Sequence, residues 1–496
     1  MAQSSTDRLR DLTDDLLVRD ADAHAEAVAA LAEEGDERVI PHLFEVLVID
    51  AIANDWGRFG FPAVLRGRDP PRYLDLPEVR WPGVRDALGA LAEPDYDSEH
   101  AWVEWESWYS QRDIAPLAGF DEWKLRLYRS YLPPVGALLD REPRAFDLRD
   151  VRWGNCDRSF LAALNAPDFV AGDAVSTDAA DGDRSSGADA EHGDASVAGD
   201  DAPERYLDDD DVVFGFEIDG VAYAVPRWVI FPHELLNAVV AGVPVSLTYC
   251  TLCNAPILYD RRVEGDVLTF GSSGMLVSGN KVMYDEETET LWDQHTGTPT
   301  AGRYLERDPD LALDQHLVTQ TDWGSWRAEH PDTRALDIDT GYGYDYSHYE
   351  DDVGFFEHYW TKESVIQPGV RSESGPLPEK ASVYGVTEGS RAAWVIPVDD
   401  LDDESVIAGE AAGREVVALL DATGDVAVYE APPLPVERTD GRLVDADGTQ
   451  WTVTREELRG DGGETRERVP GRHGLWFAFR THYDETHVLP GPTDDE

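Results

Sequence analysis

The chain has 496 residues, of which 100 are acidic and 42 are lysine or arginine, so its formal net charge is −58. This length exceeds what one hydrophobic core serves, and we expect about two to four domains. The charge excludes a basic surface that could release phosphate counterions, so neither nucleic acid nor an anionic membrane is expected as a partner.

The acidic residues are spread along the whole chain, and lysines are scarce beside arginines. Such a composition is typical of proteins that work in molar salt, where the Debye length falls to roughly 3 Å and self-repulsion is screened. We predict a cytoplasmic protein of a halophilic archaeon, with an acidic mesophilic protein as the alternative. The N-terminal residues predict no signal peptide, and no apolar stretch approaches the roughly 18 residues of a membrane-spanning helix.

Residues 1–150 are predicted to be mainly helical. Within residues 23–47, apolar side chains recur three and four positions apart. The pattern breaks at Gly35 and Asp36 and restarts before Pro41, which suits the first turn of a helix. The segment resembles one HEAT-type helical hairpin. Because a single unit cannot bury its own apolar face, we expect it to pack on the following domain, and it is also a candidate surface for a protein partner.

Residues 171–204 interrupt the chain with a different composition. They contain no Leu, Ile, Phe, Trp or Tyr and are rich in Asp, Ala, Gly and Ser. Such a segment cannot bury enough apolar surface to offset the entropy lost on ordering. We therefore predict a disordered acidic insertion.

From residue 212 onward the pattern changes to short β-type runs, and four blocks recur in the same order. VFGFEIDGVAYAVP at 213–226 is answered by VYGVTEGSRAAWVIP at 383–397, and the blocks continue to residues 336 and 489. We predict an α+β fold with a helical N-terminal region and a tandem-duplicated β-rich module. The first copy is placed at 151–339, a connector at 340–380, and a degenerate second copy at 381–496.

The two copies share their apolar and aromatic residues but differ in their reactive ones. A frame kept in both copies indicates packing, whereas groups present in one copy are better candidates for chemistry. The unmatched positions, with their counterparts in parentheses, are Cys250 (Asp421), Cys253 (Gly424), Gln294 (Val453) and His295 (Thr454).

Cys250 and Cys253 form a Cys-x-x-Cys motif between two predicted strands. A turn of this kind can aim two thiolates at one metal ion, as in a zinc knuckle, but a complete site needs two further ligands. We hypothesise a site for zinc or another transition metal, completed by histidine. The candidate histidines are His233, on a helix predicted at 232–240, His295 and His330.

Two alternatives stay open for the cysteine pair. The pair could cycle between dithiol and disulfide, although a redox Cys-x-x-Cys usually opens a helix and these flanks are β-like. Both cysteines could instead be buried structural residues of a non-enzymatic scaffold, since free cysteine is among the most buried residue types. Residues 271–274 (GSSG) predict a plain turn, and they lack the lysine and spacing of a phosphate loop, so no nucleotide cofactor is indicated.

Three long segments resemble the domain-of-unknown-function family 3179. They are HELLNAVVAGVPVSLTYCTLCNAPILYDRRV, LTFGSSGMLVSGNKVMYDEETETLWDQHTGTPTAGRYL and TDWGSWRAEHPDTRAL, in a match that spans roughly residues 151–336. The resemblance implies no activity, and the second copy departs from the motifs. It places Cys250, Asp285, Trp292, Gln294 and Gly297 in the family's motifs, so Cys250, Asp285 and Gln294 are our catalytic candidates.

Overall fold

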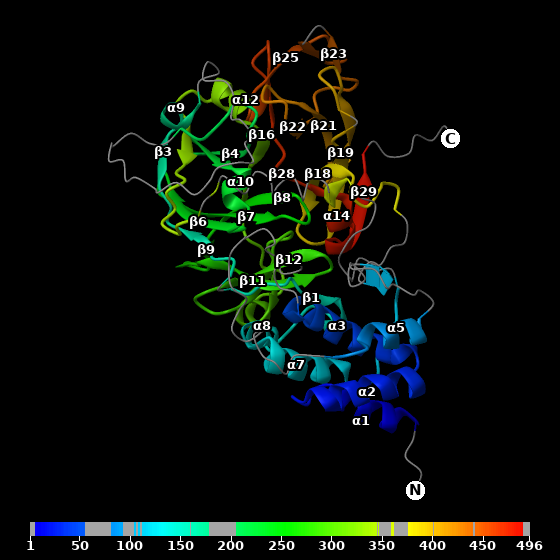
Figure 1. Ribbon diagram of the computed structural model, residues 1–496. Coiled ribbons are helices and arrows are strands. Elements are labelled where there is room, and N and C mark those ends of the chain that lie inside the picture. The colour runs from blue at the N-terminus through cyan, green and yellow to red at the C-terminus, as the bar shows by residue number, and fades with distance from the viewer. Residues whose placement is uncertain are drawn as a thin grey trace, which may run out of the picture.

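The computed structural model joins a helical region to a set of β-sheets (Figure 1). It describes residues 5–54, 81–92, 104–105, 108–109, 112–158, 160–177, 205–344, 346, 359–361, 375–399, 401–439 and 442–489. The predicted α+β class, with helices first and β-structure after, is confirmed. Within the described ranges, every helix is too short or too polar to cross a bilayer.

The N-terminal helices form a layer at one end of the molecule (Figure 1). Asp20 caps the second helix by accepting from the backbone N–H groups of Asp22 and Ala23, and Gly35 ends it, which is where the sequence pattern breaks. The resemblance to a HEAT unit stays a prediction. The helices are α1 (Ser5–Asp15), α2 (Ala21–Glu34), α3 (Ile40–Asn54), α5 (Val84–Leu91), α7 (Phe120–Tyr131) and α8 (Pro133–Leu139).

A buried cluster of charges fastens this layer to the β-rich region. Glu45 of α3 accepts from Lys124 Nζ of α7 at 2.7 Å and from an Arg152 guanidinium nitrogen at 2.6 Å. Arg152 lies on β1 (Val151–Trp153), and Tyr128 Oη donates to the same carboxylate at 3.0 Å. The helical layer therefore packs on the domain that follows it, as expected.

One sheet of the β-rich region is built on a tight hairpin. Strands β4 (Val212–Ile218) and β5 (Val221–Pro226) pair across Asp219 and Gly220, whose φ angles of 50° and 75° make a turn that suits the hairpin. β16 (Thr319–Asp322) runs antiparallel to β4, and β17 (Arg334–Leu336) runs parallel to β5. Helix α12 (Trp323–Glu329) connects β16 to β17, and β3 (Phe169–Ala171) completes the sheet.

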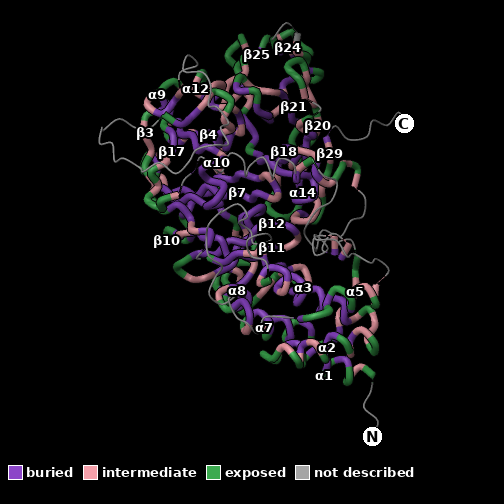
Figure 2. Tube along the Cα trace, in the orientation of Figure 1, coloured by how far each residue is buried: buried purple, intermediate pink, exposed green. Residues whose placement is uncertain are grey.

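One further five-stranded sheet carries the cysteine segment, and a second one contacts it. One has the order β15-β8-β7-β6-β2, and the other has the order β1-β11-β12-β13-β14. Buried residues are concentrated in these central strands (Figure 2). Their remaining bounds are β2 (Leu164–Asn165), β6 (Leu235–Val240), β7 (Val243–Cys250), β8 (Ala255–Asp260), β15 (Gln315–His316), β11 (Phe270–Val277), β12 (Asn280–Asp285), β13 (Leu291–Asp293) and β14 (Pro299–Ala301).

The C-terminal part repeats the connectivity of the hairpin sheet. Strand β28 (Gly471–Leu475) runs antiparallel to β18 (Ser382–Glu388), which pairs with β19 (Ala392–Pro397), and β29 (Glu485–Val488) runs parallel to β19. Helix α14 (Trp476–His482) connects β28 to β29 as α12 connects β16 to β17. The tandem duplication that the sequence suggested stays a prediction.

A three-stranded and a five-stranded sheet complete the C-terminal part. The first has the order β20-β21-β22 and the second the order β23-β24-β25-β26-β27. Their strands are β20 (Ile407–Ala411), β21 (Arg414–Leu420), β22 (Val426–Glu430), β23 (Glu437–Thr439), β24 (Arg442–Val444), β25 (Gln450–Val453), β26 (Glu457–Gly460) and β27 (Thr465–Glu467).

Two local predictions were wrong. The helix expected at 232–240 is replaced by strand β6 from Leu235, and only α10 (Arg227–Ile230) is helical nearby. Strand β6 pairs with β7 along its whole length, and that pairing overrides a weak helical pattern. Residues 271–274 are not a plain turn but part of β11, where a register shift between Ser272 and Met275 marks a bulge.

The prediction of a disordered insertion at 171–204 was wrong for its first seven residues. Residues 171–177 are ordered, because Ala171 ends β3 and Gly172–Val175 forms helix α9, whose Val175 is fully buried. The rest of that prediction, residues 178–204, lies outside the described residues. Most of the predicted connector at 340–380 lies outside them as well.

Candidate functional site

The two cysteines sit at the turn between β7 and β8. Cys250 is the last residue of β7 and pairs with Ala255, the first residue of β8. Between them the chain turns tightly, with Asn254 at a φ of 46°. This turn brings the sulfurs of Cys250 and Cys253 to 2.8 Å from each other, and both residues are almost completely buried. The two sulfurs are therefore in direct contact with each other in the protein interior.

A second turn, between β11 and β12, lies against the pair. Cys253 Sγ is 3.2 Å from the side-chain oxygen of Asn280 and 3.5 Å from the carbonyl oxygen of Gly279. The next residue, Lys281, donates from Nζ to the carbonyl of Tyr249 at 2.6 Å, directly before Cys250. Lys281 also forms a buried ion pair of 2.6 Å with Glu234. An ammonium group thus stands beside the cysteine strand, neutralised by one carboxylate.

This environment shifts the pKa values of the two thiols in opposite directions. Burial acts to raise the pKa of Cys250, but the hydrogen bond with Cys253, the charge of Lys281 and nearby backbone N–H groups outweigh it, so its pKa lies below the usual value. Burial, followed by the hydrogen bond and negative charge of Cys250, raises the pKa of Cys253 well above its usual value. Of the two thiols, Cys250 is therefore the one that loses its proton more readily.

A histidine from the C-terminal part reaches the same region. His482 Nδ1 on α14 lies 2.6 Å from Asp293 Oδ2, and Asp293 also accepts the backbone N–H groups of His295 and Thr296, each at 2.8 Å. Burial would raise the pKa of Asp293, but the imidazolium of His482 holds it well below its usual range. Burial would lower the pKa of His482, but Asp293 and the negative charge of Cys250 raise it.

The C-terminal part also covers the cysteine turn. The backbone N–H of Leu475 donates to the carbonyl of Cys253 at 2.9 Å. Leu475, Phe477 and Ala478 form one apolar cluster with the two cysteines and Ala255. Burial of the pair thus depends on both halves of the β-rich region, although the sequence comparison treated the second as a degenerate copy.

Two of the predicted metal ligands have contacts of their own. His233 lies in the turn before β6, where its ring nitrogens contact the carbonyl of Ala162 at 2.7 Å and Tyr346 Oη at 2.6 Å. His330 follows α12 and packs on Trp326, with ring centroids 4.0 Å apart. Throughout the described residues, no three His, Cys, Asp or Glu side chains are grouped so that they could hold a metal ion.

Gln294 contacts both strands that flank the cysteine turn, and His295 is the next residue along the chain. Gln294 Nε2 donates to Thr248 Oγ1 at 3.0 Å and to the carbonyl of Ala255 at 3.1 Å, so it bridges β7 and β8. His295 Nδ1 lies 3.2 Å from Tyr483 Oη, and its ring meets Phe479 edge-on. Burial, followed by the charges of Arg472 and His482, lowers the pKa of His295 well below its usual value, so it is neutral.

Asp285, the third catalytic candidate, braces a turn. Its carboxylate accepts from Trp292 Nε1 at 2.9 Å and from the backbone N–H of Thr288 at 2.6 Å. Asp445 repeats the arrangement in the C-terminal part, where it accepts from Trp451 Nε1 at 3.0 Å. The same contact occurs in both halves of the β-rich region, which fits a structural role.

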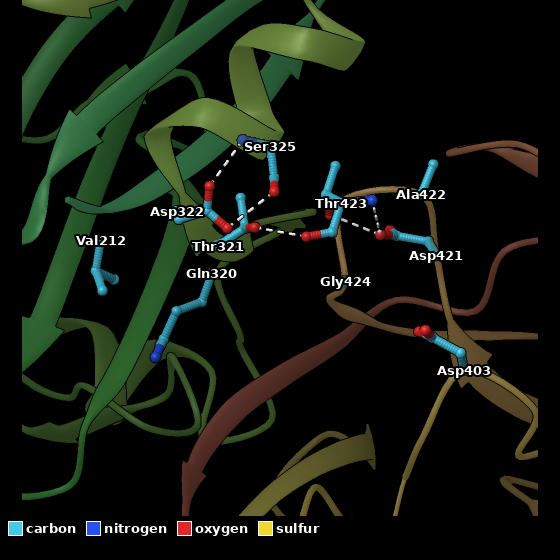
Figure 3. A pocket seen from close by; sticks show the side chains of 10 residues that line it. All are labelled: Val212, Gln320, Thr321, Asp322, Ser325, Asp403, Asp421, Ala422, Thr423 and Gly424. Carbon is cyan, nitrogen blue, oxygen red and sulfur yellow. Dashed lines mark hydrogen bonds between the residues drawn. The ribbon is translucent and has the colours of Figure 1, made fainter. Parts of the chain in front are cut away.

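Residues 421–424 form the turn that aligns with the cysteine turn, and they border an open polar cavity of about 520 Å³ (Figure 3). Thr321 Oγ1 of β16 donates to the carbonyl of Thr423 at 2.6 Å, joining this turn to the first half of the region. Two of the three carboxylates that line it already serve the fold. Asp322 caps α12 through the backbone N–H of Ser325, and Asp421 accepts the backbone N–H of Thr423 within its own turn. The hydroxyl of Ser325, which also lines the cavity, donates to Asp322 Oδ2 at 2.8 Å.

Sequence reasoning missed Lys281, Glu234 and His482. Lys281 is one of only four lysines in the chain, which was a usable signal in so acidic a sequence. His482 aligns with Glu329 of the first copy, so it too is a reactive group present in one copy only. The comparison missed it because it searched for unmatched groups in the cysteine-containing copy alone.

A family model described as "Protein of unknown function (DUF3179)" matches residues 194–486, which is more than half of the chain. The chain therefore belongs to this family. The match extends past the expected residue 336 and includes α14, so the C-terminal part lies within the family domain. Searches of curated proteins and of solved structures gave no match.

Proposed function

We propose that Cys250 and Cys253 form a thiol–disulfide exchange centre. The observation that carries the proposal is the 2.8 Å contact between two sulfurs in unequal surroundings. A disulfide bond of about 2.05 Å requires only a small further approach. Because the thiolate is the nucleophile in exchange, the lowered pKa of Cys250 fits the attacking residue, and the raised pKa of Cys253 fits the residue that closes the ring afterwards.

The exchange with a small disulfide R–S–S–R balances in two steps. The Cys250 thiolate attacks one sulfur, forms a mixed disulfide and expels RS⁻, which takes up a proton. Cys253 then loses its proton and attacks the Cys250 sulfur, so the Cys250–Cys253 disulfide forms and a second RS⁻ leaves. The two cysteines lose two electrons and two protons, and two RSH molecules are produced.

The surroundings favour a small substrate. The cysteine turn is covered by α14 and β28, and Trp360 Nε1 donates to the carbonyl of Thr251 on its outer side at 2.9 Å. A large protein disulfide would have to displace these contacts, whereas a small thiol compound needs only a local opening. The acidic composition favours a salt-rich, reducing cytoplasm, in which the pair would rest as a dithiol.

The test is reversible oxidation of the folded protein in about 2 M KCl, a concentration chosen to screen its charge. After incubation in glutathione buffers of graded redox ratio, mass spectrometry should locate a disulfide between Cys250 and Cys253 that dithiothreitol removes. Cys250→Ser and Cys253→Ser should abolish it. Cys156→Ser is the matched control, because Cys156 is also a buried cysteine.

A dithiol that stays reduced in the folded protein at every redox ratio would overturn the proposal. So would about one equivalent of zinc, iron or copper in the purified protein that is lost in Cys250→Ser. Two sulfurs held by one tetrahedral zinc at about 2.3 Å stand about 3.8 Å apart, so a metal site would require the pair to open and to recruit other ligands.

A further inference from the structure

We propose that His482, oriented by Asp293, carries the protons that the cysteine pair gives up and takes back during exchange. The inference rests on the exchange function proposed above and adds the residue that makes it work in a closed site. It also assigns a chemical task to the C-terminal part of the domain, which has no cysteine of its own.

The geometry points the histidine toward this task. Asp293 holds Nδ1 at 2.6 Å and is itself fixed by two backbone N–H groups. The backbone carbonyl of Ser278 faces the buried ring, but the other ring nitrogen, Nε2, makes no well-formed hydrogen bond to a described residue. In folded proteins a buried ring nitrogen is nearly always paired. A loosely held ring nitrogen on a histidine that a carboxylate orients is an arrangement suited to proton transfer.

Helix α14 packs against the turn that contacts the cysteine pair. Thr481 Oγ1, on the residue before His482, donates to the carbonyl of Ser278 at 3.2 Å. Ser278 begins the turn whose next two residues, Gly279 and Asn280, contact Cys253 Sγ. One helical turn earlier, Ala478 belongs to the apolar cluster around both sulfurs.

The reaction needs a proton carrier because water is largely excluded. When Cys253 attacks the mixed disulfide it must lose its proton, and the oxygens of Gly279 and Asn280 that it contacts are not bases. Lys281 is committed as an ammonium to Glu234 and to a backbone carbonyl. Removal of the Cys253 proton therefore falls to an imidazole, and His482 is an oriented one.

The charged groups around His482 come from several elements. Asp293 on β13 is the carboxylate in contact with it, and Cys250 adds negative charge when ionised. On the opposite side, neutral His295 stacks near its ring with centroids 5.9 Å apart, and the guanidinium of Arg472 on β28 acts on Asp293. Lys281 and Glu234 neutralise each other. The surrounding charges favour the imidazolium most strongly while Cys250 is a thiolate, and the ring gives up its proton more readily once Cys250 is oxidised.

The first experiment measures the rate of exchange with a small disulfide against pH. His482→Gln should slow closure of the Cys250–Cys253 disulfide by about 100-fold near neutral pH, the lower end of general acid–base contributions. Asp293→Asn should slow it less and shift the pH profile, since the ring stays but loses its orientation. The final extent of oxidation should not change. His473→Gln, which breaks another buried histidine–carboxylate pair of 2.7 Å at Asp425, should leave the rate unchanged.

The second experiment does not depend on how the histidine variants fold. Histidine-selective NMR should show that the pKa of His482 falls when Cys250→Ser removes the thiolate. An unchanged pKa, or exchange in His482→Gln at the wild-type rate and pH profile, would overturn the inference while the exchange centre stands. If the wild-type pair never oxidises, the exchange centre itself fails, so the two failures are distinct.

Discussion

At the scale of single residues, the cysteine pair is defined by the groups that its sulfurs contact. Cys156 is as deeply buried as Cys250, but burial and the charges of Glu234 and Asp157 raise its pKa well above the usual value. Lys281 acts on both thiols, but only Cys250 also has the hydrogen bond of Cys253 and backbone donors around its sulfur. Hydrogen-bond donors at the sulfur, rather than exposure, therefore separate the reactive thiol from an inert one.

Lys281 should control both the reactivity and the stability of this site. Lys281→Met removes the ammonium, so the pKa of Cys250 should rise and its alkylation by iodoacetamide near pH 7 should slow about tenfold, which corresponds to about one pKa unit. The same change leaves Glu234 buried without its cation and should cost about 3–5 kcal/mol of unfolding free energy.

A double variant separates these two effects. Lys281→Met combined with Glu234→Gln should recover most of the unfolding free energy, measured by urea titration, because no unpaired charge remains buried. Alkylation of Cys250 should stay slow. Recovery of both stability and alkylation rate would mean that Lys281 acts on the cysteine only through the fold.

The His482–Asp293 pair predicts a pH dependence of stability. His482 has a raised pKa and Asp293 a lowered one, so the pair contributes fully between about pH 4 and 6.5, the ordinary values of the two groups. The contribution is lost as pH rises through the raised pKa of His482, and also as pH falls through the lowered pKa of Asp293. His482→Gln should therefore lose about 2 kcal/mol near pH 5.5 and much less near pH 9 in urea unfolding. An equal loss at both pH values would contradict the ion pair.

At the scale of secondary-structure elements, the two halves of the β-rich region share local devices. The Asp–Trp brace recurs as Asp285 with Trp292 and as Asp445 with Trp451. Each hairpin sheet also lets an aromatic ring of its connecting helix pack onto a glycine. A Cβ on Gly215 would lie 2.4 Å from Trp326, and one on Gly385 would lie 2.1 Å from Phe479. Because the braces and the glycine contacts occur in both halves, we assign them a structural role. The cysteines and His482 have no residue of the same type at the aligned position of the other half.

The brace predicts equal effects in the two halves. Asp285→Asn and Asp445→Asn should each cost about 1–3 kcal/mol of unfolding free energy, because the amide nitrogen cannot accept the hydrogen bonds of the turn. Neither variant should change the rate or extent of disulfide formation at Cys250. Loss of exchange in Asp285→Asn, with its stability preserved, would restore Asp285 as a catalytic residue.

The glycines predict unequal effects in the two halves. Alanine at Gly385 must displace Phe479, which lies three residues before His482 on α14, so Gly385→Ala should both destabilise the protein by about 1–3 kcal/mol and slow the exchange reaction. Gly215→Ala should destabilise it similarly through Trp326 and leave the exchange rate unchanged. Thermal unfolding and exchange kinetics should be measured on both variants. If both exchange at the same rate, the position of α14 does not affect the exchange reaction.

Local sequence patterns predicted the fold best where a single residue type determines the backbone geometry, as at helix ends. The break in the apolar pattern at Gly35 and Asp36 correctly located the end of helix α2. The prediction at 232–240 was wrong because strand pairing with β7 decides that segment. The cysteine pair was found from the copy comparison, but Lys281 and His482 reach it through contacts between strands and helices far apart in sequence. Such contacts leave no local periodicity to detect.

At the scale of the whole molecule, charge opposes compaction. A net charge of −58 is folded into one chain, and the acidic groups are spread over all of its parts. Self-repulsion of this size is reduced only when counterions shorten the Debye length, from about 10 Å at 0.1 M salt to about 3 Å at 1 M. The contacts that bring α14 over the cysteines join two such acidic parts, so they should be sensitive to ionic strength.

Stability and cysteine chemistry should therefore respond to salt together. The melting temperature should rise steeply between about 0.1 and 2 M KCl, and the Cys250–Cys253 disulfide should form reversibly only at the higher concentrations. Potassium thiocyanate of equal ionic strength screens charge without strengthening apolar burial, so it should reproduce only the electrostatic share of the gain. At low salt, partial separation of α14 from the cysteine turn should expose Cys250 and raise its alkylation rate before the helices unfold. A melting temperature that is independent of salt would show that the carboxylates are already balanced within the fold, and the cover over the cysteines would then be held by packing alone.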